Sequence, residues 1–400
     1  MKSVRWATIG LVITSLLAGC KGFWDLPPST TTTTTTPTTK SSGVFYVLNQ
    51  TTKQIAAYDI SSGTLENVTG SPYALSAAPT SIAVAANGAF LYVGTVNGIY
   101  LYSIGSGGEL TLANNNNPIY GDAPAAMIVD GSWLIDAYAT LTSNNPVIDA
   151  IPIDSSTGLY NGPSGVAAPS QTYSGITNAS LNGMVLSPDG ANLIVALGSA
   201  GTIVVPFTSG NANPIATTAT VIPLANSNGS ALSAAVDPTS RVFYIGETNI
   251  NSTGGLRVFN YSSLGTAVPR AEPSQITGSP IASGGLSPLA ILPIANGEYV
   301  YVANGQGDTS TGNVAWFPIT ASGTTYSIAS GSKIDSGIYP DGLAEDSEGN
   351  FVLAIASGGT TSSGDPDLDA FTMSSGALTS AIQSKTGTDP VGAVAVAALP

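Results

Sequence analysis

The feature that most constrains this chain is an internal repeat that occurs seven times after Gly43. Each unit contains a β-branched and aromatic run, a loop, a second such run, a Ser/Thr-Gly turn, a short third run and an apolar run of small residues. Four strands per unit, with units about 43 to 59 residues apart, are typical of the blades of a β-propeller. The first runs begin at Val44, Phe90, Trp133, Asn192, Val242, Tyr299 and Phe351.

The order of the runs predicts how the ring closes. The runs of small residues suit the innermost strands, where bulky side chains would clash around a central channel. The seventh such run lies at the C-terminus, whereas the repeat opens on the strand that should follow it. We therefore predict an all-β, seven-bladed propeller of four-stranded blades, closed by pairing of the C-terminal inner strand with the N-terminal strands. The inner runs are 81–85, 126–129, 183–186, 233–236, 290–292, 342–345 and 392–398, and the second runs are 55–60, 98–104, 147–153, 202–207, 256–261, 313–319 and 368–373.

Tight turns join most inner runs to the next first run. Ser187-Pro188-Asp189-Gly190 and Ala86-Asn87-Gly88 contain residues that tolerate a positive φ, as hairpin turns require. We interpret Asp189 and Asn87 as structural residues.

The N-terminus predicts export. Lys2 and Arg5 precede an apolar run over 6–18 that is too short to span a bilayer, so residues 1–19 form a secretory signal. Leu17 to Cys20 resembles the lipobox of bacterial lipoproteins, which implies that Cys20, the only cysteine, carries a lipid anchor in the membrane. The alternative is an ordinary signal peptide followed by a free cysteine. Lys21 follows where an aspartate would favour the inner membrane in such lipoproteins, so we expect an outer-membrane lipoprotein that faces the periplasm or the cell surface.

A polar tract follows the expected anchor. Residues 20–43 are rich in Pro, Ser and Thr, with unbroken threonine from Thr30 to Thr36, and have no apolar periodicity. Such a composition predicts a disordered tether. The threonines are either glycosylated or a solvated spacer. The propeller then occupies 44–400.

Two of the first runs carry a family resemblance. The sequences FYVLN at 45–49 and VYVAN at 300–304 resemble the YVTN-type repeat. The pattern of Leu65, Ser71-Pro72-Tyr73, Pro79 and Ile82 is similar to that of the lactonase-like seven-bladed propellers. The resemblance covers about 43–400 and implies the fold of 6-phosphogluconolactonase. These are blade-building residues, so the resemblance is specific for the fold and weak for activity.

Composition excludes several function classes. Charged residues make up 8% of the chain, the net charge is −14, and Lys and Arg together number ten without a cluster, which argues against nucleic acid as a partner. Histidine is absent, and with it the usual general base and the commonest metal ligand. The resembling lactonases hold anionic substrates with basic and histidine side chains, so the resemblance does not extend to such a site.

The candidate binding face is the one where the inner strands begin. Aligned units place Thr80, Ala125, Asn182, Leu232, Leu289, Asp341 and Val391 at these starts, of which Asp341 alone is ionisable. Asp389 precedes the seventh start, and the loops of the fifth to seventh blades add further carboxylates. These residues predict either an acidic site for a cation, polyol or glycan, or simply exposed loop carboxylates. The candidate ligand-binding residues are Asp341, Asp389, Asp308, Asp365, Asn182, Thr80 and Glu247.

The sequence assigns no catalytic residue, no metal ligand and no cofactor. The segment 365–369 alternates carboxylates but lacks the layout of a calcium loop. Our first hypothesis is a monomeric, non-catalytic binding or scaffold module for a protein, a glycan or an envelope component. The second is a lactonase-like hydrolase of a neutral lactone, and the third is a purely structural surface protein.

Overall fold

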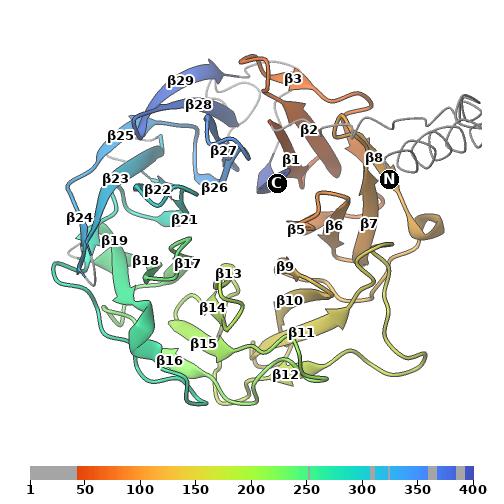
Figure 1. Cartoon of the computed structure of the whole chain (residues 1–400), viewed down its shortest axis with the longest axis horizontal. Coiled ribbons are helices and arrows are strands. Elements are labelled where there is room, and N and C mark those ends of the chain that lie inside the picture. Colours follow the sequence, from red (N-terminus) through yellow and green to blue (C-terminus); the bar gives the residue numbers. More distant parts are fainter. Residues whose placement is uncertain (1–42, 251–252, 307–310, 323–324, 359–366, 384–391) are drawn as a thin grey trace, which may run out of the picture. The chain divides into compact units, whose positions relative to one another are not determined.

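The computed structural model describes residues 43–400 except 251–252, 307–310, 323–324, 359–366 and 384–391. Every described residue belongs to one compact unit of the chain. Within that unit seven antiparallel sheets form a ring, which confirms the predicted seven-bladed β-propeller (Figure 1). None of the described segments is a helix of the length and apolarity needed to cross a membrane.

The blades are numbered in chain order, and the strands of each are given from the innermost outward. Blade 1 contains β30 (Ala393–Ala398), β1 (Val44–Asn49), β2 (Gln54–Asp59) and the short β3 (Glu66–Asn67) and β4 (Tyr73–Ala74), which both pair with β2. Blade 2 contains β5 (Pro79–Val84), β6 (Phe90–Thr95), β7 (Gly98–Ile104) and β8 (Leu110–Leu112), and is followed by the 3-10 turn η1 (Asn114–Asn116). Blade 3 contains β9 (Ala126–Asp130), β10 (Trp133–Ala139), β11 (Pro146–Pro152) and β12 (Ser170–Thr172).

The remaining four blades repeat this order. Blade 4 contains β13 (Gly183–Leu186), β14 (Asn192–Ala196), β15 (Thr202–Pro206) and β16 (Thr220–Ile222). Blade 5 contains β17 (Ala231–Val236), β18 (Val242–Ile250), β19 (Thr253–Asn260), the 3-10 turn η2 (Tyr261–Leu264) and β20 (Ile281–Ala282). Blade 6 contains β21 (Pro288–Pro293), β22 (Tyr299–Asn304), β23 (Asn313–Ser322), β24 (Thr325–Ile328) and β25 (Ser332–Asp335). Blade 7 contains β26 (Pro340–Glu345), β27 (Phe351–Ala356), β28 (Leu368–Ser374) and β29 (Ala377–Gln383).

The ring closes in blade 1 as predicted. The C-terminal strand β30 pairs with β1 in an antiparallel register from Phe45 opposite Ala398 to Leu48 opposite Ala395. The backbone N–H of Leu399 extends the ladder by donating to the Val44 carbonyl at 2.8 Å. The blade thus joins the two ends of the domain, and its β1 is buried along its whole length.

The core lies between the blades. The described buried side chains form seven apolar clusters, and each cluster joins one pair of neighbouring blades. Between blades 7 and 1, for example, Phe45 and Val47 pack with Leu353 and Ile355, all of them fully buried. Strands such as β1 and β14 are almost entirely apolar in sequence because both of their faces pack against a neighbouring blade. A charged residue in such a strand is therefore expected to need a partner.

The turns after the inner strands contain side chains that bind their own backbone. In the turn after β13, the Asp189 carboxylate accepts from the backbone N–H of Ala191 at 3.1 Å and from the Tyr261 hydroxyl of blade 5 at 2.6 Å. Gly190 has a φ of 67°, which favours glycine. Asn87 accepts similarly from the backbone N–H of Ala89 at 2.9 Å. Both residues have the structural role that the sequence predicts.

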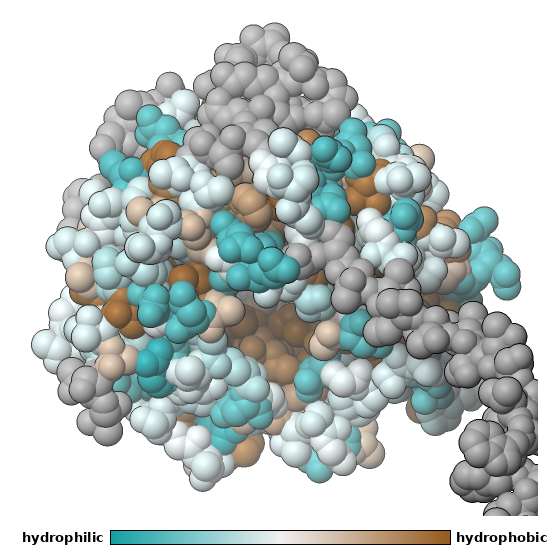
Figure 2. All heavy atoms as spheres, turned by 45° about the horizontal axis from the view of Figure 1, so that its top comes forward, coloured by the Kyte–Doolittle hydropathy of each residue, from teal (hydrophilic) through white to brown (hydrophobic). Residues whose placement is uncertain are grey.

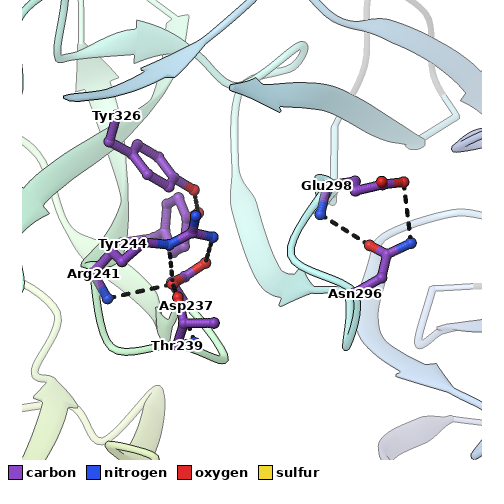
Figure 3. Close-up of polar contacts among 7 residues, drawn as sticks. All are labelled: Asp237, Thr239, Arg241, Tyr244, Asn296, Glu298 and Tyr326. Atoms are coloured by element: carbon purple, nitrogen blue, oxygen red, sulfur yellow. Dashed lines mark hydrogen bonds and ion pairs between the residues drawn. The ribbon is translucent and has the colours of Figure 1, made fainter. Parts of the chain in front are cut away.

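The corresponding turn of blade 5 holds a compensated charge (Figure 3). Arg241 donates to both carboxylate oxygens of Asp237, each at 3.0 Å, and its guanidinium lies over the ring of Tyr326 from blade 6. Burial favours a higher pKa for Asp237, but the hydrogen bonds from Arg241 and Thr239 outweigh it and hold the pKa below its ordinary value. Tyr244 and Tyr326 hydrogen-bond to each other beside this pair.

Candidate functional site

Two of the predicted face residues are used to join blades. The Thr80 hydroxyl, at the start of β5, donates to the carbonyl of Pro124 at 2.6 Å, in the segment that leads into blade 3. The Asn182 side chain, just before β13, donates to the carbonyl of Ala231 at 2.9 Å, at the start of blade 5. Both donors therefore bind backbone of a neighbouring blade, and neither is left to contact a ligand through that hydrogen.

Asp341 remains a candidate ligand-binding residue in the structure. It is the second residue of β26 and lies at a register shift between Pro340 and Gly342. One of its carboxylate oxygens is buried without a hydrogen-bond partner among the described residues. Burial raises the pKa of Asp341 to about 7, against a smaller opposing effect of a hydrogen bond with Ser357. At neutral pH this carboxyl is therefore present in both protonation states.

Glu247 is in a different environment from the one expected of a face residue. Its side chain is buried in blade 5, where it accepts from Arg257 at 2.7 Å and from the backbone N–H of Ala225 at 2.9 Å. The Arg257 guanidinium also donates to the carbonyl of Pro223 at 2.7 Å. Both Glu247 oxygens are thus bonded in an internal ion pair, in which the Nε of Arg257 is buried without a hydrogen-bond partner among the described residues. The other predicted carboxylates, Asp308, Asp365 and Asp389, lie outside the described residues, as does Val391.

The structure brings together three carboxylates that sequence reasoning missed. Asp122 lies in the segment that enters blade 3, and Asp136 and Asp149 stand opposite each other on β10 and β11. One oxygen from each of these residues lies within 4.8 Å of the others. Asp136 is fully buried and Asp149 is almost so, whereas Asp122 is half-buried. We call this set the carboxylate triad.

The triad lies between blades 2 and 3, toward the face where the inner strands begin. Asp136 pairs with Met127, the second residue of β9. It lies on the same side of β10 as Leu134, which packs with Ile99 and Leu101 of blade 2. The segment that carries Asp122 is fixed to the same blade, because the backbone of Ile119 donates to the carbonyl of Ile99 at 2.8 Å.

No ion pair with a described residue compensates the carboxylates of the triad. Both oxygens of Asp136, and one each of Asp122 and Asp149, are buried without a well-formed hydrogen bond from a described residue. Burial, followed by the charges of Asp149 and Asp122, raises the pKa of Asp136 well above its usual range, against a smaller opposing effect of the Asp149 backbone N–H. Burial also raises the pKa of Asp122 to about 7, and Asp149 adds to the effect through a hydrogen bond and its charge. The Tyr138 hydroxyl donates to the second Asp149 oxygen at 3.4 Å.

A signal for the triad is present in the sequence once the blades are aligned. Asp136 is the fourth residue of the first run that begins at Trp133. The fourth residue of every other first run is apolar and buried. These residues are Val47, Val93, Val195, Ile245, Val302 and Ala354. A carboxylate at a core position of a strand that is otherwise apolar is the anomaly that an alignment along whole strands would have revealed.

A cavity of about 420 Å³ lies elsewhere, at the outer strands of blades 5 and 6. Its lining includes Ile281, Ala315, Phe317, Ile328 and Lys333, so it is mainly apolar. It is formed by β20, β23, β24 and β25, which are distant in each blade from the inner strands. This cavity is therefore not the mouth of the central channel.

Comparison with solved structures supports the fold. A protein from Bacteroides uniformis and one from Bacteroides fragilis, both provisionally assigned as 6-phosphogluconolactonases, are similar with TM-scores of 0.60 and 0.62 at 16% and 14% identity. These matches cover 88% and 89% of this chain and 98% of each of the other chains. The periplasmic gluconolactonase of Pseudomonas aeruginosa matches with a TM-score of 0.61 at 17% identity, over 89% of this chain and 99% of its own. No protein-family model and no curated protein matches the chain.

Proposed function

We propose that this protein is a non-catalytic recognition propeller, tethered to the membrane through Cys20, that binds a protein, glycan or envelope component at the face where the inner strands begin. The observation that carries the proposal is that most of the described polar groups predicted at this face are bonded within the protein. Thr80 and Asn182 hold neighbouring blades together, and Glu247 is neutralised inside blade 5. Among the described inner-strand starts, Asp341 remains as the ionisable group.

The arginines of the propeller support a ligand that is not an anion. Arg241 pairs with Asp237 at 3.0 Å and Arg257 pairs with Glu247 at 2.7 Å. Arg270 donates to the side chain of Asn192 at 2.6 Å and to backbone carbonyls. A site for a phosphorylated sugar needs donors that are still available for its phosphate. We therefore expect a neutral or cationic ligand.

The shape of the surface agrees with recognition of an extended ligand. Figure 2 shows a face that is hollowed at its centre, with apolar residues in the depth and hydrophilic residues around the rim. The inner strands carry half-buried apolar side chains that suit such a floor, among them Ile82, Ile291 and Leu343. An apolar floor with a polar rim is a common arrangement for binding sugars and protein segments.

A second function is favoured by the setting of Asp341 in β26, where one carboxylate oxygen is buried without a partner among the described residues and burial raises the pKa to about 7. A carboxylate with this pKa can act as a general base at neutral pH. It would take a proton from water, the resulting hydroxide would add to the lactone carbonyl carbon, and the ring C–O bond would break to give a hydroxy acid, with the proton returned to the leaving oxygen. The similar fold of the gluconolactonases is compatible with this reaction on a neutral lactone and does not by itself indicate it.

One set of measurements on the purified protein separates the two functions. Hydrolysis of δ-gluconolactone, corrected for the spontaneous reaction, is compared in the wild type, Asp341→Asn and the control Glu272→Gln, which changes an exposed loop carboxylate. Thermal melts with δ-gluconolactone, peptidoglycan fragments and neutral oligosaccharides are recorded in parallel.

The recognition proposal predicts no enzymatic hydrolysis and a higher melting temperature with a glycan or peptidoglycan probe, reduced in Asp341→Asn. Hydrolysis by the wild type and by Glu272→Gln that Asp341→Asn lowers by about 100-fold or more would instead establish the lactonase.

A further inference from the structure

We propose that the carboxylate triad of Asp122, Asp136 and Asp149 is a calcium site that fastens the segment entering blade 3 to the interface between blades 2 and 3. The three residues converge from different parts of the chain, and one oxygen of each lies within 4.8 Å of the others. The triad lies toward the same face as the proposed binding site, but it contains none of that site's candidate residues, and the calcium proposal does not depend on the proposed function.

Asp136 provides the strongest argument for a bound cation, because burial of a carboxylate without a partner is unfavourable. Its side chain is completely inaccessible, and neither of its oxygens has a well-formed hydrogen bond with a described residue; the nearby backbone N–H of Asp149 offsets only part of the rise in its pKa. A buried carboxylate without a donor costs several kcal/mol, and folded proteins keep such groups where a metal or a counter-charge compensates them. One of the Asp136 oxygens lies within 4.8 Å of an oxygen of each of the two other carboxylates, so a cation among the three could bind one oxygen from each.

Blade 5 is a useful comparison, because it compensates a buried charge with an ion pair at the same level of its sheet. In blade 3 Asp136 stands opposite Asp149, and Tyr138 stands opposite Val147. In blade 5 the matching strand positions hold Ile245 opposite Arg257, and Glu247 opposite Gly255. The position of Asp149 is thus taken in blade 5 by an arginine that forms an ion pair with Glu247 at 2.7 Å.

Blade 3 lacks such a cation in its described part. The groups that face the triad are acidic or phenolic: Tyr138 donates to Asp149, and Tyr120 lies close enough to feel the charges of Asp122 and Asp149. No lysine or arginine belongs to blade 3 or to the segment that enters it, since residues 111–240 contain neither. Blade 3 and the segment that enters it therefore supply no positive charge at this level, and a cation from solution would supply one.

The donor set selects the kind of cation. Carboxylate oxygens are hard ligands that suit calcium, magnesium or manganese, whereas zinc and copper favour nitrogen and sulfur. Calcium binds oxygen at about 2.3 to 2.6 Å, so ligand oxygens of one ion can lie up to about 5 Å apart, which accommodates the triad. Magnesium, at about 2.0 to 2.1 Å, keeps several waters and is usually bound by one or two carboxylates, so three converging carboxylates favour calcium. Water would complete the shell on the half-exposed side of Asp122.

The site would also explain the position of Asp122. In the sequence, the inner strand β9 lies between Asp122 and Asp136. The segment that contains Asp122 crosses from blade 2 to blade 3. A calcium ion bound by Asp122, Asp136 and Asp149 would link that crossing to β10 and β11. The predicted effect is therefore on the stability of the blade 2–blade 3 interface.

The test measures the metal directly. The purified protein, treated with a chelator and then dialysed, is titrated with Tb³⁺ and the luminescence excited through tyrosine is recorded, since Tyr138 lies beside the site. Calcium should displace the terbium, and magnesium should do so only at concentrations at least about 10-fold higher. Thermal melts with calcium or chelator accompany the titration, with an expected rise of about 3 °C or more at saturating calcium.

Three variants decide the outcome. Asp136→Val restores the residue type of the other blades, and Asp122→Asn removes a ligand at a half-exposed position where misfolding is not expected. Both should lose the terbium signal and the calcium-dependent rise in melting temperature, whereas the control Glu272→Gln should retain them. The proposal is overturned if the wild type binds no terbium and does not respond to calcium, or if Asp136→Val and Asp122→Asn respond as the wild type does.

Discussion

Blades 3 and 5 place buried charges at the same level of the same kind of sheet, and they differ in how those charges are balanced. In blade 5 Arg257 and Glu247 form a buried ion pair, and Glu247 also accepts from a backbone N–H. In blade 3 Asp136 and Asp149 stand opposite each other, and Asp136 has no well-formed hydrogen bond with a described residue. The propeller scaffold thus accepts a charge between blades, but only blade 5 supplies the counter-charge from its own chain.

The comparison distinguishes buried charged residues with a structural role from those that are candidates for binding. A buried pair that is complete needs no further ligand and fixes the local packing. A buried group of like charges is unstable by itself and is therefore a candidate for binding. The same argument assigns Asp237 and Arg241 to structure (Figure 3).

The largest expected effect comes from opening the ring, because blades 3 and 5 both depend on the closed propeller for their packing. Deletion of 391–400 eliminates β30, which pairs with β1 over most of its length. We expect the domain to lose cooperative unfolding, because the buried core of blade 1 would be exposed. Circular dichroism and thermal melting test this, and a truncated protein that melts like the wild type would contradict the closure.

Breaking the blade 5 pair should produce the next largest effect. Arg257→Leu leaves Glu247 buried without its counter-charge, and we expect a loss of about 3 to 5 kcal/mol in the free energy of unfolding. The double variant Arg257→Leu/Glu247→Leu should recover most of this loss, because a buried pair is often replaceable by apolar residues. Urea denaturation measures both. Equal destabilisation of the single and double variants would show that the pair is not balanced as described.

An uncompensated carboxylate should also be visible in the pH dependence of stability. The pKa of Asp341 is raised to about 7 in the folded protein, above its ordinary value near 3.8, so the folded state holds the proton more tightly. Its contribution to stability is complete below about pH 4 and is lost as the pH rises through 7, by up to about 4 kcal/mol. Asp237, whose pKa is lowered, has the opposite sign: its contribution is present above about pH 4 and is lost in acid.

Asp341→Asn should therefore be stabilised relative to the wild type more at pH 8 than at pH 5. Urea denaturation at the two pH values measures the difference, with Glu272→Gln as the control. A difference between variant and wild type that is the same at both pH values would show that Asp341 is not buried in the folded protein as described.

The sequence was sufficient for the fold because a propeller is a local repeat. The first runs from Val44 to Phe351 begin at the observed strands, and β13 has the predicted limits, since each run is a largely apolar segment between turns. The position of Asp341 at an inner-strand start followed from the same alignment.

The site was less predictable because it depends on contacts between blades. Alignment of the inner-strand starts did not include the middle of the first runs, where Asp136 replaces an apolar residue. The approach of Asp122 depends on the path of an irregular segment, which no periodicity describes. Glu247 was placed at the face by its register, but its environment is set by Arg257, on the neighbouring strand of the same hairpin.

The central claim is that blade 3 contains a buried carboxyl group, that of Asp136, for which the described part of the chain provides no partner, and Asp136→Val tests it most directly. The free energy of unfolding is measured by urea denaturation in excess chelator for the wild type and the variant. We predict that Asp136→Val is more stable by about 1 to 3 kcal/mol, because it removes an unsatisfied carboxylate and restores an apolar contact. A variant less stable than the wild type under these conditions would contradict the account, since Asp136 would then be satisfied within the protein itself.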